Sequence, residues 1–170
     1  MVGRPSDDVV CREASDDDWP AIRPIVRRVL ASGDTYLYPP DLSDEDARQM
    51  WMHRGDRSAT YVAESGGRVS ATAYLRPNQP GQGDHVANAG WMVDPDATGR
   101  GLGRLLGGFV IDDARRRGFL AMQFNAVVAT NVAAVGLWTS LGFAVVGTVP
   151  DAFRHPREGL VDLLVMHRHL

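Results

Sequence analysis

The sequence contains no lysine, because all 18 of its basic residues are arginine. A Walker-type phosphate loop, a protein-kinase site and a pyridoxal-phosphate site each depend on a lysine ammonium group for their chemistry. The absence of lysine therefore excludes all three of these protein classes.

Cysteine is almost absent as well. The single Cys11 excludes an internal disulfide, a cysteine zinc cluster and a CxxC redox pair, and we expect it to be a small core residue. No apolar run approaches the ~20 residues that a membrane-spanning helix needs. Residues 1–10 carry Asp7 and Asp8 where a signal peptide would be hydrophobic. We therefore expect a cytoplasmic protein that does not bind a membrane.

Positive charge does not dominate either, since 18 basic residues face 21 acidic ones and the formal net charge is −3. This balance argues against nucleic acid as a partner. The 170 residues, of which 44% are hydrophobic, are typical of a globular chain. Because there is no internal repeat, low-complexity tract or long linker, we expect residues 1–170 to form one domain.

Hydrophobic periodicity and capping residues predict alternating helices and strands. Helices are expected from the Ser15 cap to Leu30, from the Ser43 cap to Met52, from Leu102 to Gly118, and from the Asn131 cap to Gly142. Strands are expected at residues 9–12, 61–64, 69–75, 85–93, 121–128, 143–149 and 160–167. The third helix should bury Leu102, Leu105, Leu106, Phe109 and Ala114 on one face. This order predicts an α+β, or mixed α/β, fold.

Three glycines stand in five residues between a predicted strand and the following helix, in the segment Thr98-Gly99-Arg100-Gly101-Leu102-Gly103. Bare amides at a helix N-terminus, which carries about half a positive charge, let an anion approach closely. Arg100 and Arg104 flank this loop and could reach further phosphates. The spacing does not fit the dinucleotide fingerprint GxGxxG. On the loop alone, a tight turn that merely begins a helix is an open alternative.

Together with Val93, Asn131 and Leu141-Gly142-Phe143, this loop resembles the GNAT family, the Gcn5-related N-acetyltransferases, over nearly the whole chain. The resemblance implies a mixed, mostly antiparallel sheet of about seven strands flanked by helices. It implies a splay between the strand that ends at Val93 and the strand that starts near Ala121. It also implies acetyl-CoA (coenzyme A) as the cofactor and no metal. The family's pyrophosphate loop has the pattern [Gln/Arg]-x-x-Gly-x-[Gly/Ala], and Thr98 here replaces the usual Gln or Arg.

The resemblance gives cofactor-binding roles to Met92 and Val93, to the loop from Thr98 to Arg104, and to Asn131. The backbone amide near Val93 is expected to steady the oxyanion, which makes Val93 a catalytic candidate. Asn131 is expected to hydrogen-bond the pantetheine arm. It can also be a plain helix N-cap, and the two roles can coexist.

Trp138 departs from the family's pattern. Many members place a tyrosine seven residues after the asparagine to protonate the departing thiolate. An indole N–H can donate a hydrogen bond but is not a general acid near neutral pH. We therefore expect Trp138 to contact the cofactor, without a side-chain general acid at this position.

An amine must lose a proton before it attacks, and the candidate bases are Glu64, Asp84, His85, Asp94 and His155. Glu64 is expected to be solvated and Asp94 to cap a turn. His85 is the catalytic candidate because it opens the strand that leads to the splay. His155, in a predicted loop between the last strands, is a substrate-binding candidate.

A metal site is not expected. His167 and His169 are spaced to share a strand face, but the sequence offers them no third ligand.

Two asparagine-bearing segments, residues 77–90 and 124–131, resemble a narrower GNAT branch. This branch includes fungal N-acetyltransferases that act on azetidine-2-carboxylate and related cyclic imino acids. Asparagines matching Asn88 and Asn125 face the acceptor there, so both are substrate-binding candidates and Asn125 is also a catalytic one. An amide can hold a carboxylate or orient a neutral amine without adding charge. Alternatively, both asparagines satisfy backbone groups where the strands splay.

These observations predict an acetyl-CoA-dependent N-acetyltransferase that acts directly on the amine of a small molecule, such as a cyclic imino acid or an amino acid analogue. Transfer to a protein or peptide N-terminus is one alternative. A CoA-binding sensor without catalysis is another, and Trp138 is the argument for it. The acidic charge and the insertion at residues 77–83 favour a small molecule. Because dimers are common in the family, a homodimer is also expected.

Overall fold

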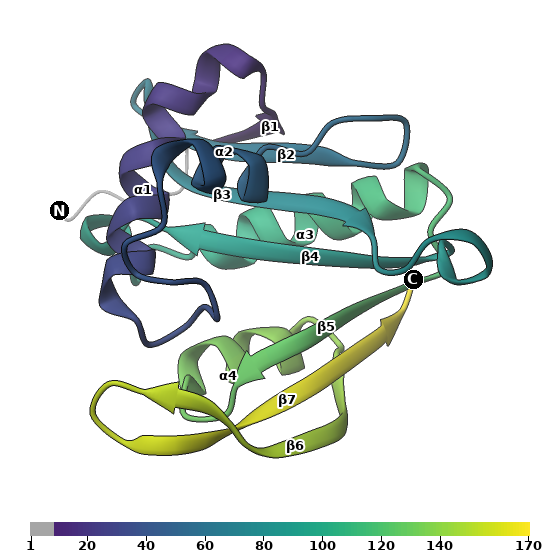
Figure 1. Ribbon diagram of the computed structural model, residues 1–170. Coiled ribbons are helices and arrows are strands. Elements are labelled where there is room, and N and C mark those ends of the chain that lie inside the picture. The colour runs from purple at the N-terminus through teal and green to yellow at the C-terminus, as the bar shows by residue number, and fades with distance from the viewer. Residues whose placement is uncertain (1–8) are drawn as a thin grey trace, which may run out of the picture.

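The computed structural model describes residues 9–170 and places seven strands in one sheet. The strands are β1 Val9–Glu13, β2 Ala59–Ser65, β3 Arg68–Pro77, β4 Val86–Val93, β5 Ala121–Val128, β6 Ala144–His155 and β7 Gly159–His169. Their order is β1-β2-β3-β4-β5-β7-β6, with β4 and β5 parallel and the other neighbours antiparallel (Figure 1). The expected mixed, mostly antiparallel sheet is confirmed.

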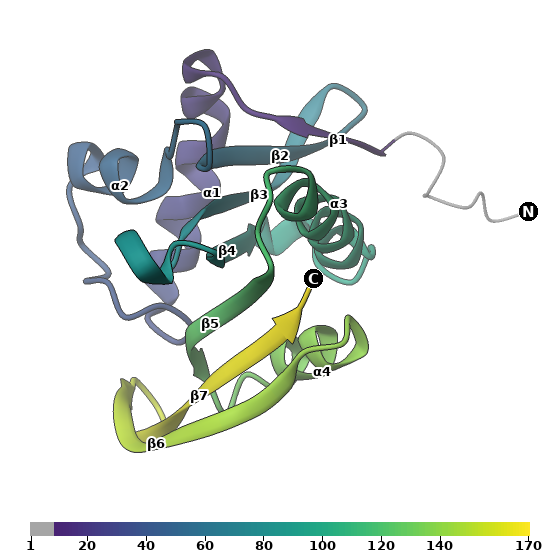
Figure 2. The same cartoon turned by 90° about the vertical axis from the view of Figure 1, so that its right-hand side faces the viewer.

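Four α-helices cover this sheet: α1 Trp19–Ser32, α2 Asp44–Trp51, α3 Leu102–Arg116 and α4 Val132–Ser140. Helices α1 and α2 lie on one face and α3 lies on the other (Figures 1 and 2). Helix α2 begins at its expected cap, where the Ser43 hydroxyl accepts a 3.1 Å hydrogen bond from the Asp46 amide. Within residues 9–170, no helix has both the length and the apolar character needed to cross a membrane. Asp7 and Asp8, which argued against a signal peptide, lie outside the described residues.

Each face of the sheet carries its own apolar core. Helix α1 buries Ile22 and Ile25 against Met92 of β4. On the other face, α3 buries four residues spaced by one helical turn: Leu102, Leu106, Val110 and Ala114. Leu105 was expected among them but is 46% exposed, because it lies at the margin of the stripe that these four residues define.

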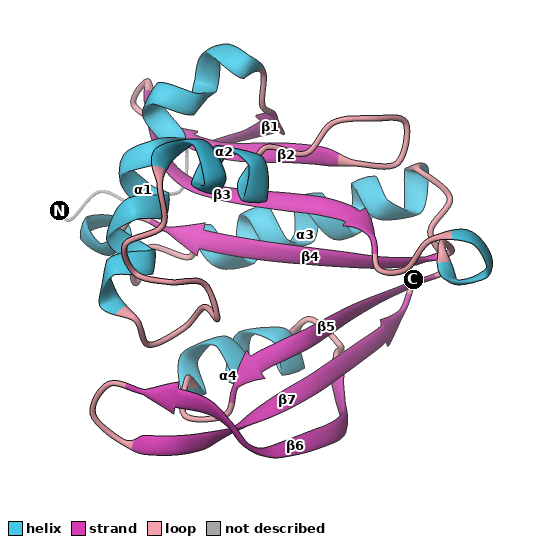
Figure 3. Cartoon of the chain, in the orientation of Figure 1, coloured by secondary structure: helices cyan, strands magenta, loops and turns pink. Residues whose placement is uncertain are grey.

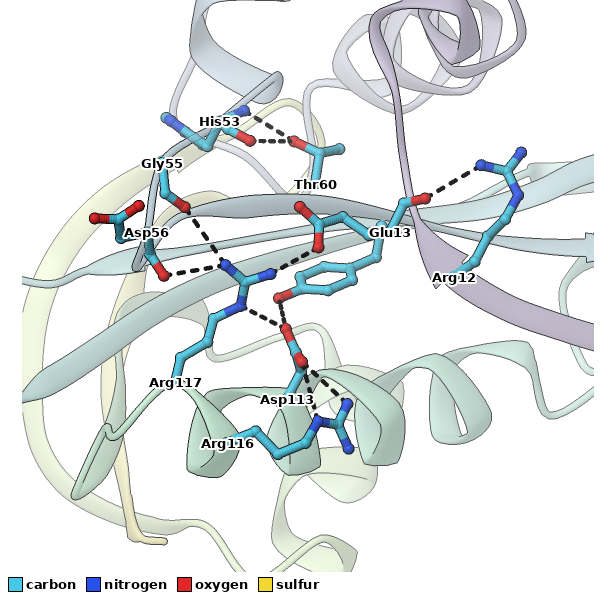
Figure 4. A network of polar contacts seen from close by, with 10 residues as sticks. Arg12, Glu13, His53, Gly55, Asp56, Thr60, Asp113, Arg116 and Arg117 are labelled. Carbon is cyan, nitrogen blue, oxygen red and sulfur yellow. Dashed lines mark hydrogen bonds and ion pairs between the residues drawn. The ribbon is translucent and has the colours of Figure 1, made fainter.

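A charged network fastens the C-terminal end of α3 to β1 and β2 (Figure 4). Asp113 accepts a 2.6 Å hydrogen bond from the Tyr61 hydroxyl and pairs with Arg117 at 2.6 Å. Arg117 also pairs with Glu13 of β1 at 2.7 Å. Burial opposes the ionisation of Asp113, but the hydrogen bonds from Tyr61 and Arg117 outweigh it, so the pKa of Asp113 is lowered.

Strands β4 and β5 pair only where they begin, at Val86 with Ala121 and at Ala87 with Met122. Beyond these pairs they diverge toward their C-terminal ends (Figure 3). The expected splay is therefore confirmed, and it leaves most of β4 without a partner on its β5 side.

The last strand pair is longer than the sequence predicts. Strand β6 continues past Val149 to His155, so His155 belongs to a strand and the prediction of a loop is wrong. The pairing register shifts between Val149 and Phe153, and Asp151 adopts a left-handed conformation with φ of 52°. Such a bulge interrupts the alternation by which a strand is recognised in a sequence.

Candidate functional site

The divergence of β4 and β5 opens into a cavity of about 530 Å³. Two sets of residues line it. The first set, which we call the α4 wall, comes from the end of β4, the loop before α3, and α4: Trp91, Val93, Thr98, Asn131, Ala134 and Trp138. The second set, the tyrosine wall, comes from the loop after α1 and from β3, β4 and β5: Tyr36, Tyr38, Tyr74, Arg76, Asn88 and Asn125.

The backbone of β4 presents polar groups to the gap between the strands. The Asp94 amide donates to the Ser70 carbonyl, so this pair is a hydrogen-bonded pair of the β3–β4 ladder. Because such pairs alternate in an antiparallel ladder, the amides and carbonyls of Ala89, Trp91 and Val93 point away from β3. Strand β5 has already diverged at these positions. The Val93 amide is therefore available to a ligand in the gap.

Met92, the other predicted cofactor residue of β4, differs from Val93. It is the partner of Thr72, and its backbone groups belong to the β3–β4 ladder. Its side chain is buried and contributes to the cavity lining. Met92 can therefore offer a ligand only apolar contact.

The loop before α3 presents several amides in sequence. Among residues 9–170, the amides from Gly99 to Gly103 donate to no backbone carbonyl. Gly99 and Gly101 have φ of 77° and 75°, a conformation in which other residues are strained. A Cβ at Gly103 would lie 3.1 Å from Leu137, so glycine here lets α3 approach α4. These amides and the N-terminus of α3 form a cradle suited to an anion.

The side chains of this loop that were predicted to bind the cofactor offer fewer free polar groups to a ligand than the loop backbone does. The Thr98 hydroxyl donates to the Pro95 carbonyl at 3.1 Å, which closes its own turn, while the residue lines the cavity. Leu102 buries its side chain in the core. Arg100 and Arg104 are exposed, and Arg104 donates to the Ser140 hydroxyl at 2.7 Å.

Helix α4 supplies Asn131 and Trp138 to the cavity. The side-chain oxygen Oδ1 of Asn131 accepts from the Ala134 amide at 3.1 Å, so this residue is an N-cap that keeps its side-chain amide hydrogens for a ligand. Trp138 is buried, with its ring centroid 4.5 Å from that of Trp91 and 5.0 Å from that of Phe124. These packed aromatic rings make this part of the cavity lining apolar.

The tyrosines of the opposite wall are held by hydrogen bonds. The Tyr36 hydroxyl donates to the backbone carbonyl of Trp91 at 2.8 Å, and the Tyr74 hydroxyl donates to the side-chain oxygen Oδ1 of Asn88 at 3.3 Å. Burial raises the pKa of both hydroxyls. Both tyrosines are therefore neutral hydrogen-bonding groups over the physiological pH range.

Asn88 and Asn125 both line the cavity, from opposite sides of the gap. Asn88 is buried and donates to the Gln123 carbonyl of β5 at 3.1 Å. Asn125 donates to the Asn78 side chain at 2.7 Å and accepts from the Gln123 side chain at 2.9 Å. Asn88 thus satisfies a backbone group across the splay, which is the alternative role that the sequence analysis left open for it. Asn125 instead belongs to a chain of side-chain amides at the cavity mouth.

None of the five predicted bases lines the cavity. His85 is exposed and precedes β4, at the end where β4 and β5 meet rather than diverge. His155 is buried at the end of β6, where its Nδ1 accepts from the amides of Arg157 and Glu158 at 3.3 and 3.1 Å. The structure therefore brings neither histidine to the site.

The three acidic candidates are engaged elsewhere. Glu64 forms a 2.5 Å ion pair with Arg12 and is not simply solvated as expected. Asp94 caps its turn by accepting from the Asp96 amide at 3.1 Å, as predicted, and two arginines also pair with it. Asp84 pairs with Arg57 at 3.3 Å.

The sequence analysis missed several polar groups of the tyrosine wall, namely Tyr36, Tyr38, Tyr74 and Arg76. The tyrosine- and proline-rich composition of residues 33–42 was a signal for the first two. No such signal marks Tyr74 or Arg76, which are ordinary strand positions in the sequence.

No metal centre is apparent in the part of the chain that the structure describes, where no three or more His, Cys, Asp or Glu residues are grouped. The rings of His167 and His169 lie 4.9 Å apart on β7 without a third ligand. Cys11 packs partly buried against the core under α3, and burial raises the pKa of its thiol.

The comparisons with known proteins agree with this geometry. The acetyltransferase (GNAT) family model matches residues 19–143. N-acetyltransferase aca1 of Schizosaccharomyces pombe is 38% identical over 97 residues, which are 56% of this chain and 46% of that protein. The chain thus spans less than half the length of this relative. The [ribosomal protein bS18]-alanine N-acetyltransferase of Escherichia coli is 30% identical over 67% of this chain and 73% of its own length.

Solved structures show the same fold along nearly the whole chain. A GCN5-related N-acetyltransferase from Kribbella flavida is 53% identical, with a TM-score of 0.93 over 96% of this chain and 99% of its own. The structure of yncA from Salmonella typhimurium with its cofactor acetyl-CoA is 26% identical, with a TM-score of 0.81 over 96% of this chain and 95% of its own.

Proposed function

This chain belongs to the GNAT acetyltransferase family, and we propose that it transfers the acetyl group of acetyl-CoA directly to the amine of a small molecule. A cyclic imino acid or another amino acid analogue is the acceptor class that we favour. The observation that carries the proposal is the β4–β5 gap. There the Val93 amide is available between an anion cradle on one side and the polar tyrosine wall on the other.

The α4 wall fits acetyl-CoA, which supplies an acetyl group activated as a thioester. The amides from Gly99 to Gly103 suit its diphosphate, and the free amide hydrogens of Asn131 suit the pantetheine arm. The Val93 amide would donate to the acyl oxygen as negative charge develops there. Loss of one such donor typically lowers a rate by about 100- to 1,000-fold.

The tyrosine wall would hold the acceptor. Asn88 and Asn125 lie on either side of the gap and can orient an amine without adding charge. Since no carboxylate or imidazole of residues 9–170 lines the cavity, the acceptor would lose its proton to solvent. The rate should therefore rise with pH along the ionisation of the acceptor amine itself, and the profile should shift when the acceptor is changed.

Trp138 occupies the position of the tyrosine acid found in many family members. Its indole carries no proton that titrates near neutral pH, and its ring packs against Trp91 and Phe124. We therefore propose that Trp138 shapes the cofactor site and that solvent protonates the departing thiolate.

Release of free CoA thiol from acetyl-CoA with a panel of acceptors tests the proposal. The panel holds azetidine-2-carboxylate, proline analogues, primary amino acids, polyamines and a short peptide. Steady release with a small amine supports the proposal, and turnover confined to cyclic imino acids supports the narrower acceptor class. Release with primary amines alone would contradict the cyclic imino acid assignment. Absence of release with every acceptor, while acetyl-CoA binds, would contradict the transferase proposal and favour the sensor.

A protein N-terminus is the second candidate acceptor, and the similarity to a ribosomal-protein alanine N-acetyltransferase favours it. The peptide in the panel separates the two candidates. Turnover of the peptide, with none of the small molecules, would replace our proposal by this alternative. Cytoplasmic location, one domain over residues 1–170 and a homodimer stay predictions.

A further inference from the structure

Among the described residues that line the cavity, one side chain carries a positive charge. Tyrosines, threonines, asparagines and apolar groups make up the rest of the lining, and the charge comes from Arg76 of β3. Arg76 is the direct partner of Asn88 in the β3–β4 register, so the two side chains lie on the same face of the sheet. The charge therefore stands at the tyrosine wall, away from the anion cradle before α3.

Arg76 has no acidic partner within the described chain. Other arginines that pack on this face do, since Arg28 and Arg68 each pair with Asp94 at 2.7 Å. No carboxylate of residues 9–170 lies within ion-pair distance of Arg76. Its guanidinium carbon lies 5.5 Å from the centre of the Tyr74 ring, a cation–π contact that holds the charge beside the cavity.

We propose that Arg76 binds the carboxylate of the acceptor and makes the site selective for amines that carry a carboxylate. This inference rests on the proposed function, since it names the acceptor class of the same site. A guanidinium matches a carboxylate with two parallel hydrogen bonds, which fixes the orientation of the acceptor as well as its affinity. The side-chain amides of Asn88 and Asn125 lie beside it to complete the contacts.

The placement of Arg76 also bears on how the acceptor lies relative to Val93. Its guanidinium lies over the ring of Tyr74, whose partner Gly90 is three residues before Val93 on β4, a distance of about 10 Å along an extended strand. A carboxylate held by Arg76 at this point lets the amine of the same molecule extend along β4 toward an acetyl group at the Val93 amide. A molecule without a carboxylate has no partner for the charge at this end.

The pairing has a chemical consequence for the amine. A neighbouring carboxylate stabilises an ammonium ion, and neutralising that carboxylate on a guanidinium lowers the pKa of the amine. Arg76 thereby favours the reactive, uncharged amine in a cavity that no carboxylate or imidazole of residues 9–170 lines. The same charge repels polycations, so polyamines should be poor acceptors.

The test is the binding of matched ligands with CoA present, followed by the fluorescence of Trp91 and Trp138 in the cavity lining. Azetidine-2-carboxylate and azetidine-2-carboxamide form one pair, and alanine and alaninamide form another. Mildly acidic solution keeps all four amines protonated. We expect at least one carboxylate to bind about tenfold more tightly than its carboxamide, as for a hydrogen bond to a charged group.

Arg76→Gln should remove this preference, and Arg76→Lys should keep part of it, because lysine retains the charge without the planar fork. Arg115→Gln is the matched control. It removes an exposed arginine of α3 that pairs with Asp112 outside the cavity, and it should leave the preference unchanged. The inference is overturned if the wild-type protein shows no carboxylate preference with either pair, or if Arg76→Gln keeps the wild-type preference.

Release of CoA thiol, measured on the same proteins, separates the two proposals. A protein that prefers carboxylates but acetylates nothing would contradict the proposed function and leave the role of Arg76 intact. A protein that acetylates the carboxamides as efficiently as the carboxylates, with an unchanged KM in Arg76→Gln, would contradict the role of Arg76 and leave the transferase intact.

Discussion

Gly90 has no side chain, and two tyrosines of the cavity occupy the space that one would take. A Cβ at this position would lie 2.6 Å from a ring carbon of Tyr74 and 3.2 Å from the Tyr36 hydroxyl. The contact with Tyr74 is closer than packed side chains tolerate, and the contact with Tyr36 is tight enough to require a small shift of its hydroxyl. The geometry of the tyrosine wall therefore depends on this glycine.

Gly90→Ala should destabilise the protein by about 1–3 kcal/mol through overpacking. It should also raise the KM for the acceptor, because Tyr74 must move and its ring lies under Arg76. Urea unfolding and steady-state kinetics measure the two effects.

Gly108→Ala on α3 is the control, since a Cβ there meets no atom within 4 Å and alanine favours a helix. An unchanged stability and KM in Gly90→Ala would contradict this account of the tyrosine wall.

Single residues of the site were predictable only where a local pattern marks them. The glycines of the anion cradle and Asn131 have such a pattern, because bare amides and a helix cap are encoded within a few residues of sequence. Arg76 has none, since its role arises from a partner on β4 and a gap beyond it. His85 was predicted because it precedes β4 in the sequence. It lies at the end of β4 that pairs with β5, so it is not at the open end of the gap.

At the scale of elements, the loop before α3 connects a strand to a helix and presents its amides at the point where β4 leaves the sheet. Its conformation requires glycine at Gly101, which is the N-cap of α3 with φ of 75°. A side chain in this conformation costs roughly 1–2 kcal/mol.

Gly101→Ala should therefore lose about 1–2 kcal/mol of stability and raise the KM for acetyl-CoA, because a methyl group then stands in the anion cradle. Gly159→Ala is a matched control with φ of 79° in the turn between β6 and β7. It should lose similar stability without a change in KM for acetyl-CoA. Equal KM values in the two variants would contradict the placement of the cofactor on this loop.

Most elements lie close to where their periodicity and caps predict them. The exception is β6, in which a bulge and the left-handed Asp151 hide the continuation of the strand from a reading based on alternation. The splay of β4 from β5 could not be predicted from periodicity, because a strand pattern does not reveal where a partner is lost. The resemblance to the family predicted it instead.

Across the whole molecule, charged networks outside the cavity hold the helices to the sheet. Asp113 joins Tyr61 of β2 and Arg117 at the end of α3, and its side chain is 16% exposed. Arg117 extends the connection to Glu13 of β1.

Asp113→Asn should lower the free energy of unfolding by about 2 kcal/mol, because it leaves partly buried donors without a charged acceptor. Asp112→Asn, on the adjacent residue, should change it by less than about 0.5 kcal/mol, since Asp112 is exposed and pairs only with Arg115 among the described residues. Equal denaturation midpoints for the two variants would contradict the role of this network.

A second network gives stability a dependence on pH. Arg12 donates two hydrogen bonds to Asp18, at 2.8 and 2.7 Å, and lowers the pKa of this carboxyl from 3.8 to about 2. Because the pKa is lowered in the folded state, the ion pair makes its full contribution to stability at pH values above the ordinary pKa of the carboxyl. This contribution is lost as the pH falls from 3.8 toward about 2.

The destabilisation caused by Asp18→Asn should therefore be largest near neutral pH, shrink as the pH falls from 3.8 toward about 2, and disappear below that pH. Asp17→Asn, an exposed neighbour in the same turn, should show no such dependence. Thermal unfolding of both variants across this pH range checks the prediction. A deficit for Asp18→Asn that stays constant down to about pH 2 would refute it.

The central claim is direct acetyl transfer to a small amine, and the fate of the acetyl group tests it. The measurement uses acetyl-CoA with an isotopic label in its acetyl group, a carboxylate-bearing amine and the purified protein, followed by mass spectrometry of both products. We expect the label in an amide of the small molecule, and none on the protein at any time. Label held covalently on the protein, or label that stays on CoA while the acceptor is in excess, would contradict the account.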